Sequence, residues 1–599
     1  MPVDEHTLKM ILGKVQKPAR YLGNEWNVFL KDHEQAKLKM AFAFPDLYEV
    51  GMSNQGIKIL YDSVNQNPDL LMERVFAPAV DMEDLLRDRG LPLFTLESRE
   101  ALSNFDVIGF SLQYELSYTN VINMLDLSGI PLYSDKRDEQ EPLVIGGGPC
   151  VFNPEPLAPF FDFFVVGEAE EVLPEILLEI ASLKAKGLSR KDLLVELSAR
   201  NDIYVPSLYQ PVYVDNILQG LNKLEPRAPD MIRKRHVEDL NRAPYPTAPV
   251  VSYIETIHDR AVVELFRGCA RGCRFCQAGY IFKPVRRRSQ DNIIDTARQL
   301  IAATGYDEIA LSSLSSTDYP NLEMLISQLE TALPAGRVKC SLPSLRLDSY
   351  SVKLADQLHH GRRSSLTFAP EAATERLRGV IKKNISEEEI FTALEDAVKA
   401  GWQGFKLYFM IGLPAEKDED VEAIPELCRR IRQYFKKQEG SNLKISVSVS
   451  TFVPKAHTPF QWEPQLPVDQ VKRRQEILKK GFSNMPGFDL SWHDAEASML
   501  EAVFARGDRR LAPVLERAWQ LGCRFDGWSE HFSFGSWKKA FQDLQITPEQ
   551  FAYHKFNYDQ ALPWGHIDCG VSKQIFIGEH HKALHLDAQK GEYDGTLEL

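Results

Sequence analysis

The sequence predicts an α/β protein with two successive parallel-sheet domains and a small α/β or α+β domain at the C-terminal end. Three observations predict this fold class. The chain has 599 residues, more than one hydrophobic core normally accommodates. Two series of short apolar runs alternate with amphipathic stretches, as strands and helices do in a parallel sheet. A proline-rich stretch at 206–250 separates the two series, and we expect it to be a linker.

The first series predicts a doubly wound, Rossmann-like domain over residues 36–205, after a helical extension at 1–35. Glycines directly follow its later strands, at Gly146, Gly147 and Gly148 and again at Gly167 beside Glu168. Such folds bind ligands at the carboxyl ends of their strands, so we expect ligand contacts there. The apolar runs that predict strands are Leu38–Phe44, Val107–Ser111, Leu143–Ile145 and Phe163–Val166.

The second series predicts a partial (β/α)6 barrel of the TIM type over residues 251–485, with its chemistry at the carboxyl ends of the strands. From 486 to 599 the pattern is less regular and rich in Trp and His, and we assign this stretch to a C-terminal accessory domain. The six barrel strands are predicted at Ala261–Phe266, Glu308–Ser312, Val338–Ser341, Ser365–Phe368, Phe405–Ile411 and Lys444–Thr451.

The composition argues against several classes of protein. A net charge of −14 disfavours a broad nucleic-acid-binding surface, which needs clustered Lys and Arg. No apolar run approaches the roughly 18 residues of a membrane span, and the N-terminal segment lacks the apolar region of a secretory signal. We therefore expect a cytoplasmic protein. We interpret the one basic run, Lys283–Arg288, as a solvated face; binding of a phosphorylated or nucleotide-like substrate, or support of the preceding loop, are the alternatives.

Three of the eight cysteines, Cys269, Cys273 and Cys276, stand together directly after the first predicted barrel strand. Thiolates are the protein ligands of iron–sulfur clusters, whereas a structural zinc site normally takes four ligands. Three thiolates on one glycine-containing loop leave an iron of a four-iron cluster open to another ligand. A zinc site completed by a distant residue and three unligated thiols are the alternatives. The other five cysteines are scattered, and we expect no disulfide.

The spacing C-x3-C-x2-C, with the aromatic Phe275 before the last cysteine, resembles the signature of the radical S-adenosylmethionine (radical SAM) superfamily. The resemblance implies that the three cysteines hold a [4Fe–4S] cluster whose fourth iron binds SAM, with Phe275 near the adenine. It also implies that an electron from the cluster cleaves SAM to a 5′-deoxyadenosyl radical. A donor such as flavodoxin or ferredoxin is then the expected protein partner.

Later segments resemble the SAM-contacting segments of the same superfamily and follow in the same order. Each also has a structural alternative, because serines after a strand often cap a helix and Glu375 with Arg378 forms an i, i+3 pair. The resemblance implies contacts from Ser312 and Ser313 to the amino group of SAM, from Glu371 to the ribose, from Arg376 or Arg378 to the carboxylate, and from Gly412 beside the adenine.

A doubly wound domain placed before the cysteine loop resembles the cobalamin (B12)-binding class of radical SAM proteins, and in particular an uncharacterised bacterial family. The match is carried by Val144–Pro149, Asn153–Pro156 and Val165–Glu170, and the likeness extends over nearly the whole chain. It implies a cobalamin bound at the glycine loops, with contacts from Tyr48, Ser53, Ser111, Gly146, Gly147, Gly148, Gly167 and Glu168.

The sequence departs from many cobalamin proteins at one position. Those proteins carry D-x-H-x-x-G after the first strand, and the histidine ligates the cobalt. The corresponding residues here are Asp46, Tyr48 and Gly51, so Tyr48 replaces the histidine. We therefore predict that cobalamin is not ligated by histidine. A degenerate domain with an interaction role is the alternative.

Several polar residues in the last third of the chain are candidates for the wall of a substrate cavity, with structural roles as the alternative. They have aromatic neighbours in the sequence: His457, His493, His566, Asp568 and Cys569.

Three functions follow from these features. The leading hypothesis is cobalamin-dependent methylation of an unactivated carbon. The second is a radical cyclisation, rearrangement or methylthiolation with a vestigial cobalamin domain; methylthiolation normally needs a second cluster, for which the remaining cysteines form no motif. The third is a non-catalytic iron–sulfur sensor or assembly protein. No feature of the sequence identifies the substrate.

Overall fold

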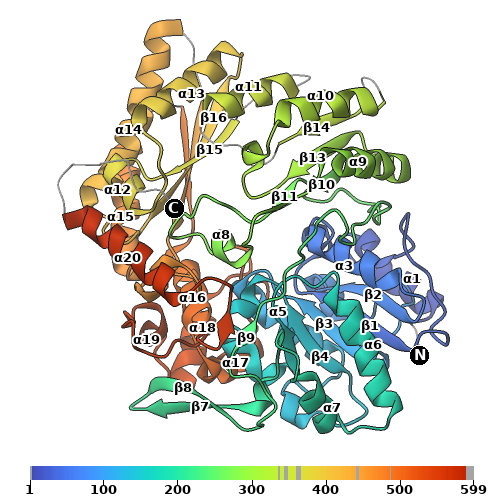
Figure 1. The fold of residues 1–599 in the computed structure, drawn as a ribbon. Coiled ribbons are helices and arrows are strands. Elements are labelled where there is room, and N and C mark those ends of the chain that lie inside the picture. The colour runs from blue at the N-terminus through green and yellow to red at the C-terminus, as the bar shows by residue number, and fades with distance from the viewer. Residues whose placement is uncertain are drawn as a thin grey trace.

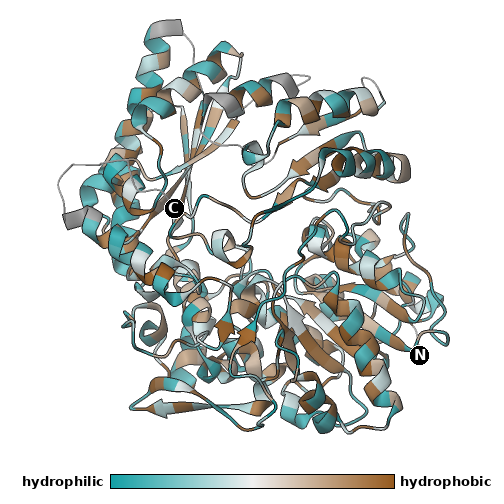
Figure 2. Ribbon diagram, in the orientation of Figure 1, coloured by the Kyte–Doolittle hydropathy of each residue, from teal (hydrophilic) through white to brown (hydrophobic). Residues whose placement is uncertain are grey.

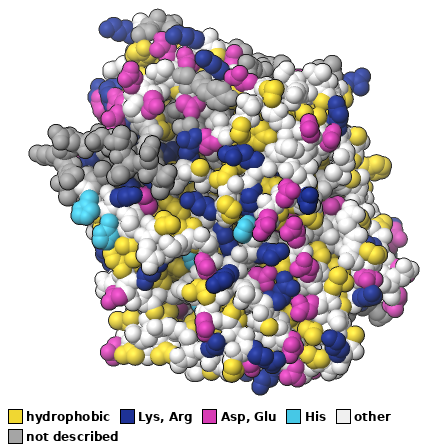
Figure 3. All heavy atoms as spheres, in the orientation of Figure 1, with side chains coloured by type: hydrophobic (Ala, Val, Ile, Leu, Met, Phe, Trp, Pro, Cys, Tyr) yellow, Lys and Arg dark blue, Asp and Glu magenta, His cyan; other side chains and the backbone are white. Residues whose placement is uncertain are grey.

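The computed structural model describes residues 3–334, 337–342, 348–358, 366–439, 444–483, 485 and 487–588. The N-terminal sheet with its helices forms one part of the molecule, and the second series of strands lies above it in Figure 1. On the face drawn in Figure 3, Lys and Arg are interspersed with Asp and Glu. None of the described helices combines the length and apolar character needed to cross a bilayer.

The predicted doubly wound domain is confirmed as a six-stranded sheet with the order β2-β1-β3-β4-β5-β6. The first five strands are parallel and β6 is antiparallel to β5. The order reverses between β1 and β3, and doubly wound sheets bind ligands at such a point. The strands are β1 (Leu38–Phe44), β2 (Leu70–Phe76), β3 (Val107–Ser111), β4 (Leu143–Gly147), β5 (Phe163–Val165) and β6 (Ile203–Tyr204).

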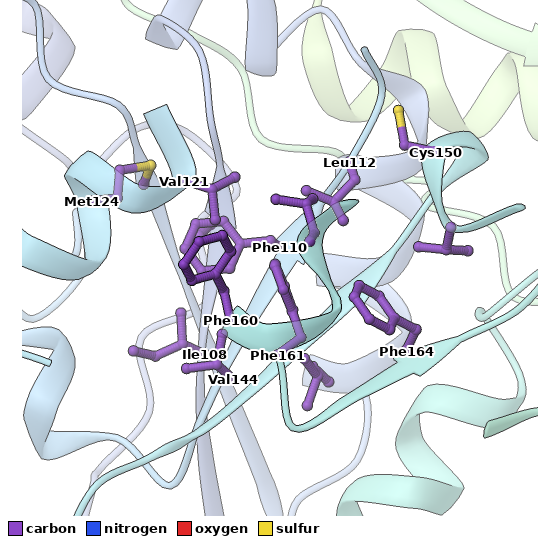
Figure 4. Packing of buried hydrophobic residues seen from close by; sticks show 14 of the residues in the cluster. Ile108, Phe110, Leu112, Val121, Met124, Val144, Cys150, Phe160, Phe161 and Phe164 are labelled. Carbon is purple, nitrogen blue, oxygen red and sulfur yellow. The ribbon is translucent and has the colours of Figure 1, made fainter. Parts of the chain in front are cut away.

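Helices on both faces bury this sheet. Its central strands are strongly apolar, as Figure 2 shows. Phe110 of β3, Phe161 and Phe164 form a continuous aromatic contact, with ring centroids 5.8 and 4.8 Å apart (Figure 4). The covering helices are α3 (Gln55–Asn65), α4 (Val80–Arg89), α5 (Tyr118–Leu127), α6 (Val172–Ala185) and α7 (Arg190–Leu197). In the N-terminal extension, α1 covers Glu5–Leu12.

The second series forms two parallel sheets, β10-β13-β14 and β15-β16-β17-β18. All six predicted strands are present, although Ser365 lies outside the described residues. A seventh strand, β18 (Phe488–Trp492), pairs in parallel with β17 and lies beyond the boundary expected at 485. The other strands are β10 (Ala261–Glu264), β13 (Glu308–Ser312), β14 (Lys339–Ser341), β15 (Leu366–Glu371), β16 (Gly404–Ile411) and β17 (Lys444–Thr451).

Amphipathic helices follow these strands, as the alternating pattern requires. Between β10 and β13, the short strands β11 (Phe266–Arg267) and β12 (Arg286–Arg287) pair in antiparallel fashion and close the base of the cysteine loop. The helices are α8 (Ala278–Ile281), α9 (Gln290–Thr304), α10 (Leu322–Ala332), α11 (Ser349–Leu358), α12 (Glu375–Val380), α13 (Glu387–Lys399), α14 (Asp418–Glu439) and α15 (Val468–Phe482).

Regular structure is also present in the segment expected to be a linker. Strands β7 (Tyr209–Val214) and β8 (Ile217–Lys223) form an antiparallel hairpin. The two residues between them, Asp215 and Asn216, both have positive φ, 49° and 61°. Asp and Asn tolerate this backbone conformation, which two-residue hairpin turns require.

The C-terminal stretch shares its hydrophobic core with the N-terminal domain. Helix α17 packs against α5, and the short strands β9 (Ile232–Arg233) and β19 (Ile567–Asp568) pair in parallel. The C-terminal helices therefore lie beside the N-terminal sheet domain, although the two are far apart in the sequence (Figure 1). The remaining elements are α16 (Ala495–Arg506), α17 (Ala512–Gln520), α18 (Phe534–Asp543), α19 (Glu549–Ala552) and α20 (Lys573–Ala588).

Candidate functional site

A cavity of about 370 Å³ lies at the carboxyl edge of the N-terminal sheet, between that sheet and the base of the cysteine loop. Its floor comes from β1, β3 and β4 and includes the point where the strand order reverses. Its opposite wall comes from the second series: Glu264, Arg267, Ile281 and Phe282. We call this space the interdomain cavity. Both flanks of the cysteine loop contribute to it.

Six of the eight residues predicted to contact cobalamin line the interdomain cavity: Ser111, Gly146, Gly147, Gly148, Gly167 and Glu168. Tyr48 and Ser53 are not among the lining residues. The Tyr48 hydroxyl donates to the carboxylate of Glu25 at 2.9 Å, and burial followed by the Glu25 charge raises the pKa of this phenol. Ser53 donates to the carbonyl oxygen of Glu49 at 2.7 Å. Both side chains are therefore engaged away from the cavity.

The glycines of this edge serve different purposes. A Cβ atom on Gly148, whose φ is +107°, would lie 2.6 Å from the carbonyl oxygen of Leu112. One on Gly167, whose φ is +110°, would lie 2.1 Å from that of Arg235. These two glycines permit protein backbone to approach protein backbone. A Cβ on Gly147 would have its nearest contact 3.9 Å away, at the carbonyl oxygen of Val165, so there is open space beside this residue.

Glu168 joins the glycine loop to the cysteine loop. Its carboxylate accepts hydrogen bonds from Arg286 at 2.6 and 2.7 Å and lies 3.0 Å from Arg267. The backbone N–H of Val237 donates to it at 2.8 Å. Burial would raise the pKa of Glu168, but the two arginines outweigh burial and lower it. The carboxylate is therefore ionised and fully engaged by protein groups.

This pairing changes the interpretation of the basic run. Two of its three arginines, Arg286 and Arg288, are buried, so the run is not a solvated face. Arg288 donates to the carbonyl oxygen of Leu240 and stacks on Tyr245, with its guanidinium 4.5 Å from the ring centroid. The run supports the base of the cysteine loop, which was one of the alternatives.

The cysteine loop leaves β11 through Gly268 and turns again at Gly272, with φ values of +89° and +67°. Burial raises the pKa of the Cys273 thiol to about 11 and also raises that of Cys276. The charge of Cys269 raises the pKa of both thiols, and the ammonium of Lys383 lowers both pKa values, so these groups share one environment.

The three thiols suit an iron–sulfur cluster by their chemistry. Thiolates are the protein ligands of such clusters, and the three cysteines lie on one loop whose thiols share an environment. Cationic irons would favour the thiolate form over the thiol.

Phe275 lies within this loop, and Glu371 and the segment before Gly412 lie beside it. Glu371 ends β15 with a φ of +67°, and its charge acts on the thiols of Cys273 and Cys276. Burial raises the pKa of Glu371, and Lys383 lies 3.4 Å from its carboxylate. Phe275 packs against the apolar cluster that includes Met410, just before Gly412.

The Gly412 turn has its own carboxylate partner. The backbone N–H groups of Gly412 and Leu413 donate to Glu416 at 2.9 and 3.3 Å. Sequence reasoning missed Glu416 and Lys383. Glu416 follows the Gly-Leu-Pro turn by two residues, whereas Lys383 lies in a charged stretch typical of an exposed surface.

The side chains of Ser313 and Arg376 are bound to other protein groups, whereas Ser312 is placed by its strand. Ser312 pairs with Glu264 at the carboxyl ends of β13 and β10, beside the cysteine loop. The Ser313 hydroxyl donates to Ser316 at 3.1 Å. Arg376 binds the carbonyl oxygen of Ala415 at 2.9 Å and pairs with Asp420.

The alternative carboxylate contact, Arg378, is buried and has a structural role. Its guanidinium donates to the carbonyl oxygens of Ala372, Ala373 and Ile385. It also lies 3.8 Å from Glu375, the i, i+3 pair that the sequence offered as an alternative.

The candidate substrate-cavity residues do not line the interdomain cavity. Burial lowers the pKa of His457 to about 4 and that of His566 to about 3, so both rings are neutral at physiological pH. His457 bonds to the carbonyl oxygen of Phe152 at 3.0 Å, and His566 packs on Tyr204 with centroids 4.4 Å apart. Cys569 is buried, Asp568 accepts from the N–H of Gly570, and His493 is exposed.

Two family models match the chain. Residues 56–206 match "Radical SAM proteins, N-terminal" and residues 263–428 match "Radical SAM superfamily". An uncharacterized protein of Methanocaldococcus jannaschii is 27% identical over 481 residues, which cover 80% of this chain and 90% of that protein. The ribosomal protein uS12 methylthiotransferase of Acaryochloris marina is 30% identical over 248 residues, 38% of this chain and 51% of its own length.

Solved structures show weaker likeness. The radical SAM methyltransferase TsrM of Kitasatospora setae has a TM-score of 0.43 at 12% identity, covering 69% of this chain and 72% of that one. The cobalamin-dependent enzyme OxsB has a TM-score of 0.46 at 13% identity, covering 91% and 79%. Similarity at this level transfers neither a cofactor nor an activity to this chain.

Proposed function

The chain belongs to the radical SAM superfamily, and from this premise we propose that it is a cobalamin-dependent methyltransferase acting on an unactivated carbon. As a radical SAM enzyme it requires a [4Fe–4S] cluster and SAM. We assign the cluster to Cys269, Cys273 and Cys276, which follow the first strand of the matched segment. A flavodoxin or ferredoxin is the proposed electron donor.

Bound SAM and a reduced cluster supply the radical that takes hydrogen from the substrate, and methylcobalamin supplies the methyl group. The chain's own residues bind and enclose these groups. Glu371 offers a buried carboxylate beside the thiols as an acceptor for the ribose hydroxyls. Phe275 and Met410 form an apolar surface suited to the adenine. Ile281 and Phe282 give the interdomain cavity an apolar wall next to the cysteine loop.

The observation that carries the cobalamin proposal is the position of the interdomain cavity. It lies at the point where the strand order reverses, and its far wall is formed by the flanks of the cysteine loop. A cofactor in this cavity would lie next to the loop that holds the radical-generating cluster. Tyr48 is turned toward Glu25 and away from this space, which supports a cobalamin without a protein ligand from that position.

Methylthiolation is the second candidate, because methylthiotransferases are among the similar proteins. The known requirement for a second cluster argues against it. The five remaining cysteines, Cys150, Cys340, Cys428, Cys523 and Cys569, are all buried and lie outside the cysteine loop. A radical cyclisation or rearrangement would leave the interdomain cavity without a role.

Anaerobic reconstitution tests the proposal in two stages. With iron, sulfide and a reductant, we expect about four irons per chain and conversion of SAM to 5′-deoxyadenosine. Protein produced with hydroxocobalamin should also show a stoichiometric corrinoid absorption band. Iron uptake without SAM cleavage would favour a sensor or assembly protein. SAM cleavage without corrinoid binding would favour radical chemistry that transfers no methyl group.

A further inference from the structure

The C-terminal helix α20 lies against the cysteine loop, although some 300 residues separate them in the sequence. Glu579 of α20 accepts a hydrogen bond at 3.1 Å from Arg274, which stands between Cys273 and Phe275. The same carboxylate lies 3.2 Å from Lys382, just after α12. Helix α20 also packs along α12 (Figure 1).

Arg274 fixes the middle of the loop to the end of α12. Its side chain is only 5% exposed, and its guanidinium donates to the carbonyl oxygens of Gly379 and Val380 at 3.0 and 2.8 Å. Its backbone N–H donates to the carbonyl oxygen of Ile381 at 3.1 Å. Glu579 supplies a negative charge beside this buried guanidinium. Burial raises the pKa of Glu579, but Arg274 and Lys382 outweigh it and lower the pKa, so the carboxylate is ionised.

A second contact from α20 supports the other side of the loop. The rings of Phe576 and Tyr280 are 5.3 Å apart, and the Tyr280 hydroxyl donates to the carbonyl oxygen of Gly272 at 3.0 Å. One helical turn beyond Glu579, Ala583 is buried in the apolar cluster against which Phe275 packs. Helix α20 therefore contacts the residues that hold the loop at three successive turns.

We propose that α20 is the element that positions the cysteine loop and that Glu579 is its positioning residue. The proposal rests on the proposed function, because the three thiols need a fixed arrangement only if the loop binds a cluster. Arg274 and Tyr280 contact α20 directly, and Phe275 packs against the apolar cluster that includes Ala583; none of the three is a cysteine of the loop. Loss of Glu579 removes the carboxylate from two cations and leaves the buried guanidinium of Arg274 without that charge, which favours an opened loop.

The test measures alkylation of each cysteine in cluster-free, full-length protein. Iodoacetamide labelling is followed by mass spectrometry at fixed pH for the wild type, Glu579→Ala and Glu579→Gln. Buried Cys428 serves as the internal reference. The matched control is Gln574→Ala, at an exposed position of the same helix. Iron content after reconstitution is a second readout.

We expect Glu579→Ala to accelerate alkylation of Cys273 and Cys276 by about tenfold or more, because opening the loop no longer breaks a charge-assisted hydrogen bond. Glu579→Gln should fall between Ala and wild type, and Cys428 and the control should not change. Rates equal to wild type would overturn the proposal. Equal acceleration at Cys428 would also overturn it, because Glu579 would then stabilise the whole fold. If the wild type takes up no iron, the proposed cluster is wrong. The difference in alkylation rate between the wild type and the Glu579 variants can still be measured in that case.

Discussion

Glu168→Gln is the substitution that most directly tests the connection between the two parallel-sheet domains. The change keeps the shape of the side chain and removes its charge. The side chain of Glu168 is only 7% exposed, accepts two hydrogen bonds from Arg286 and pairs with Arg267. Breaking a buried ion pair by removing one partner costs about 3–5 kcal/mol. Gln keeps part of the hydrogen bonding, so we expect a loss of about 3 kcal/mol.

Urea unfolding followed by tryptophan fluorescence and circular dichroism measures this loss. The control is Glu175→Gln, which removes a pair with Arg200 whose atoms are 3.5 Å apart and whose carboxylate side chain is 58% exposed. Exposed pairs contribute about 0–1 kcal/mol, so the control should remain close to wild type. Unfolding of Glu168→Gln and Glu175→Gln at the same urea concentration would show that the charge of Glu168 does not stabilise the fold.

Two further predictions concern the backbone and the buried histidines. Gly167→Ala should lower the melting temperature by several degrees or prevent folding, because its Cβ would lie 2.1 Å from a carbonyl oxygen at a φ of +110°. The control is Gly578→Ala in α20, where a Cβ meets nothing within 4 Å, and it should be neutral or slightly stabilising. A larger loss of stability in Gly578→Ala than in Gly167→Ala would contradict the geometry. The folded-state pKa of His457 is about 4, below the ordinary 6.5. Between these two pH values the folded protein therefore binds fewer protons than the unfolded protein. The free energy of unfolding should fall as the pH decreases through this window. In urea titrations at pH 4.5 and 7, His457→Gln should reduce the difference in unfolding free energy between the two pH values. The exposed control, His493→Gln, should leave this difference as it is in the wild type. An unchanged difference in His457→Gln would show that other groups control the pH dependence.

The alternation of apolar runs and the glycines after them were sufficient to predict both parallel-sheet domains. Strand β2 was not predicted, because the charged residues Glu73 and Arg74 interrupt its apolar pattern although the whole strand is buried. Arg74 pairs there with Glu25 and Glu97, at 2.8 and 2.7 Å. These partners lie 49 and 23 residues away, so no local pattern reveals that the charge is buried.

The candidate site also contains both residues that the sequence located and residues that depend on distant partners. Residues on the ends of strands, such as Ser111 and Gly147, were located from sequence because strand ends determine their position. Tyr48 was placed at the cavity by its spacing alone, but its turn directs the phenol toward Glu25. The roles of Arg286 and Glu579 depend on partners in distant segments, and a single sequence shows no sign of such pairs.

We propose that the interdomain cavity holds a cobalamin beside the cysteine loop. Gly147→Trp tests it most directly, because Gly147 lines the cavity and a Cβ there meets only open space. The measurement is the corrinoid absorption band of protein produced with hydroxocobalamin, normalised to iron content. We expect about one corrinoid per chain in the wild type and a loss of at least about tenfold in Gly147→Trp, with iron unchanged. Equal corrinoid in both proteins, or none in the wild type, would contradict it.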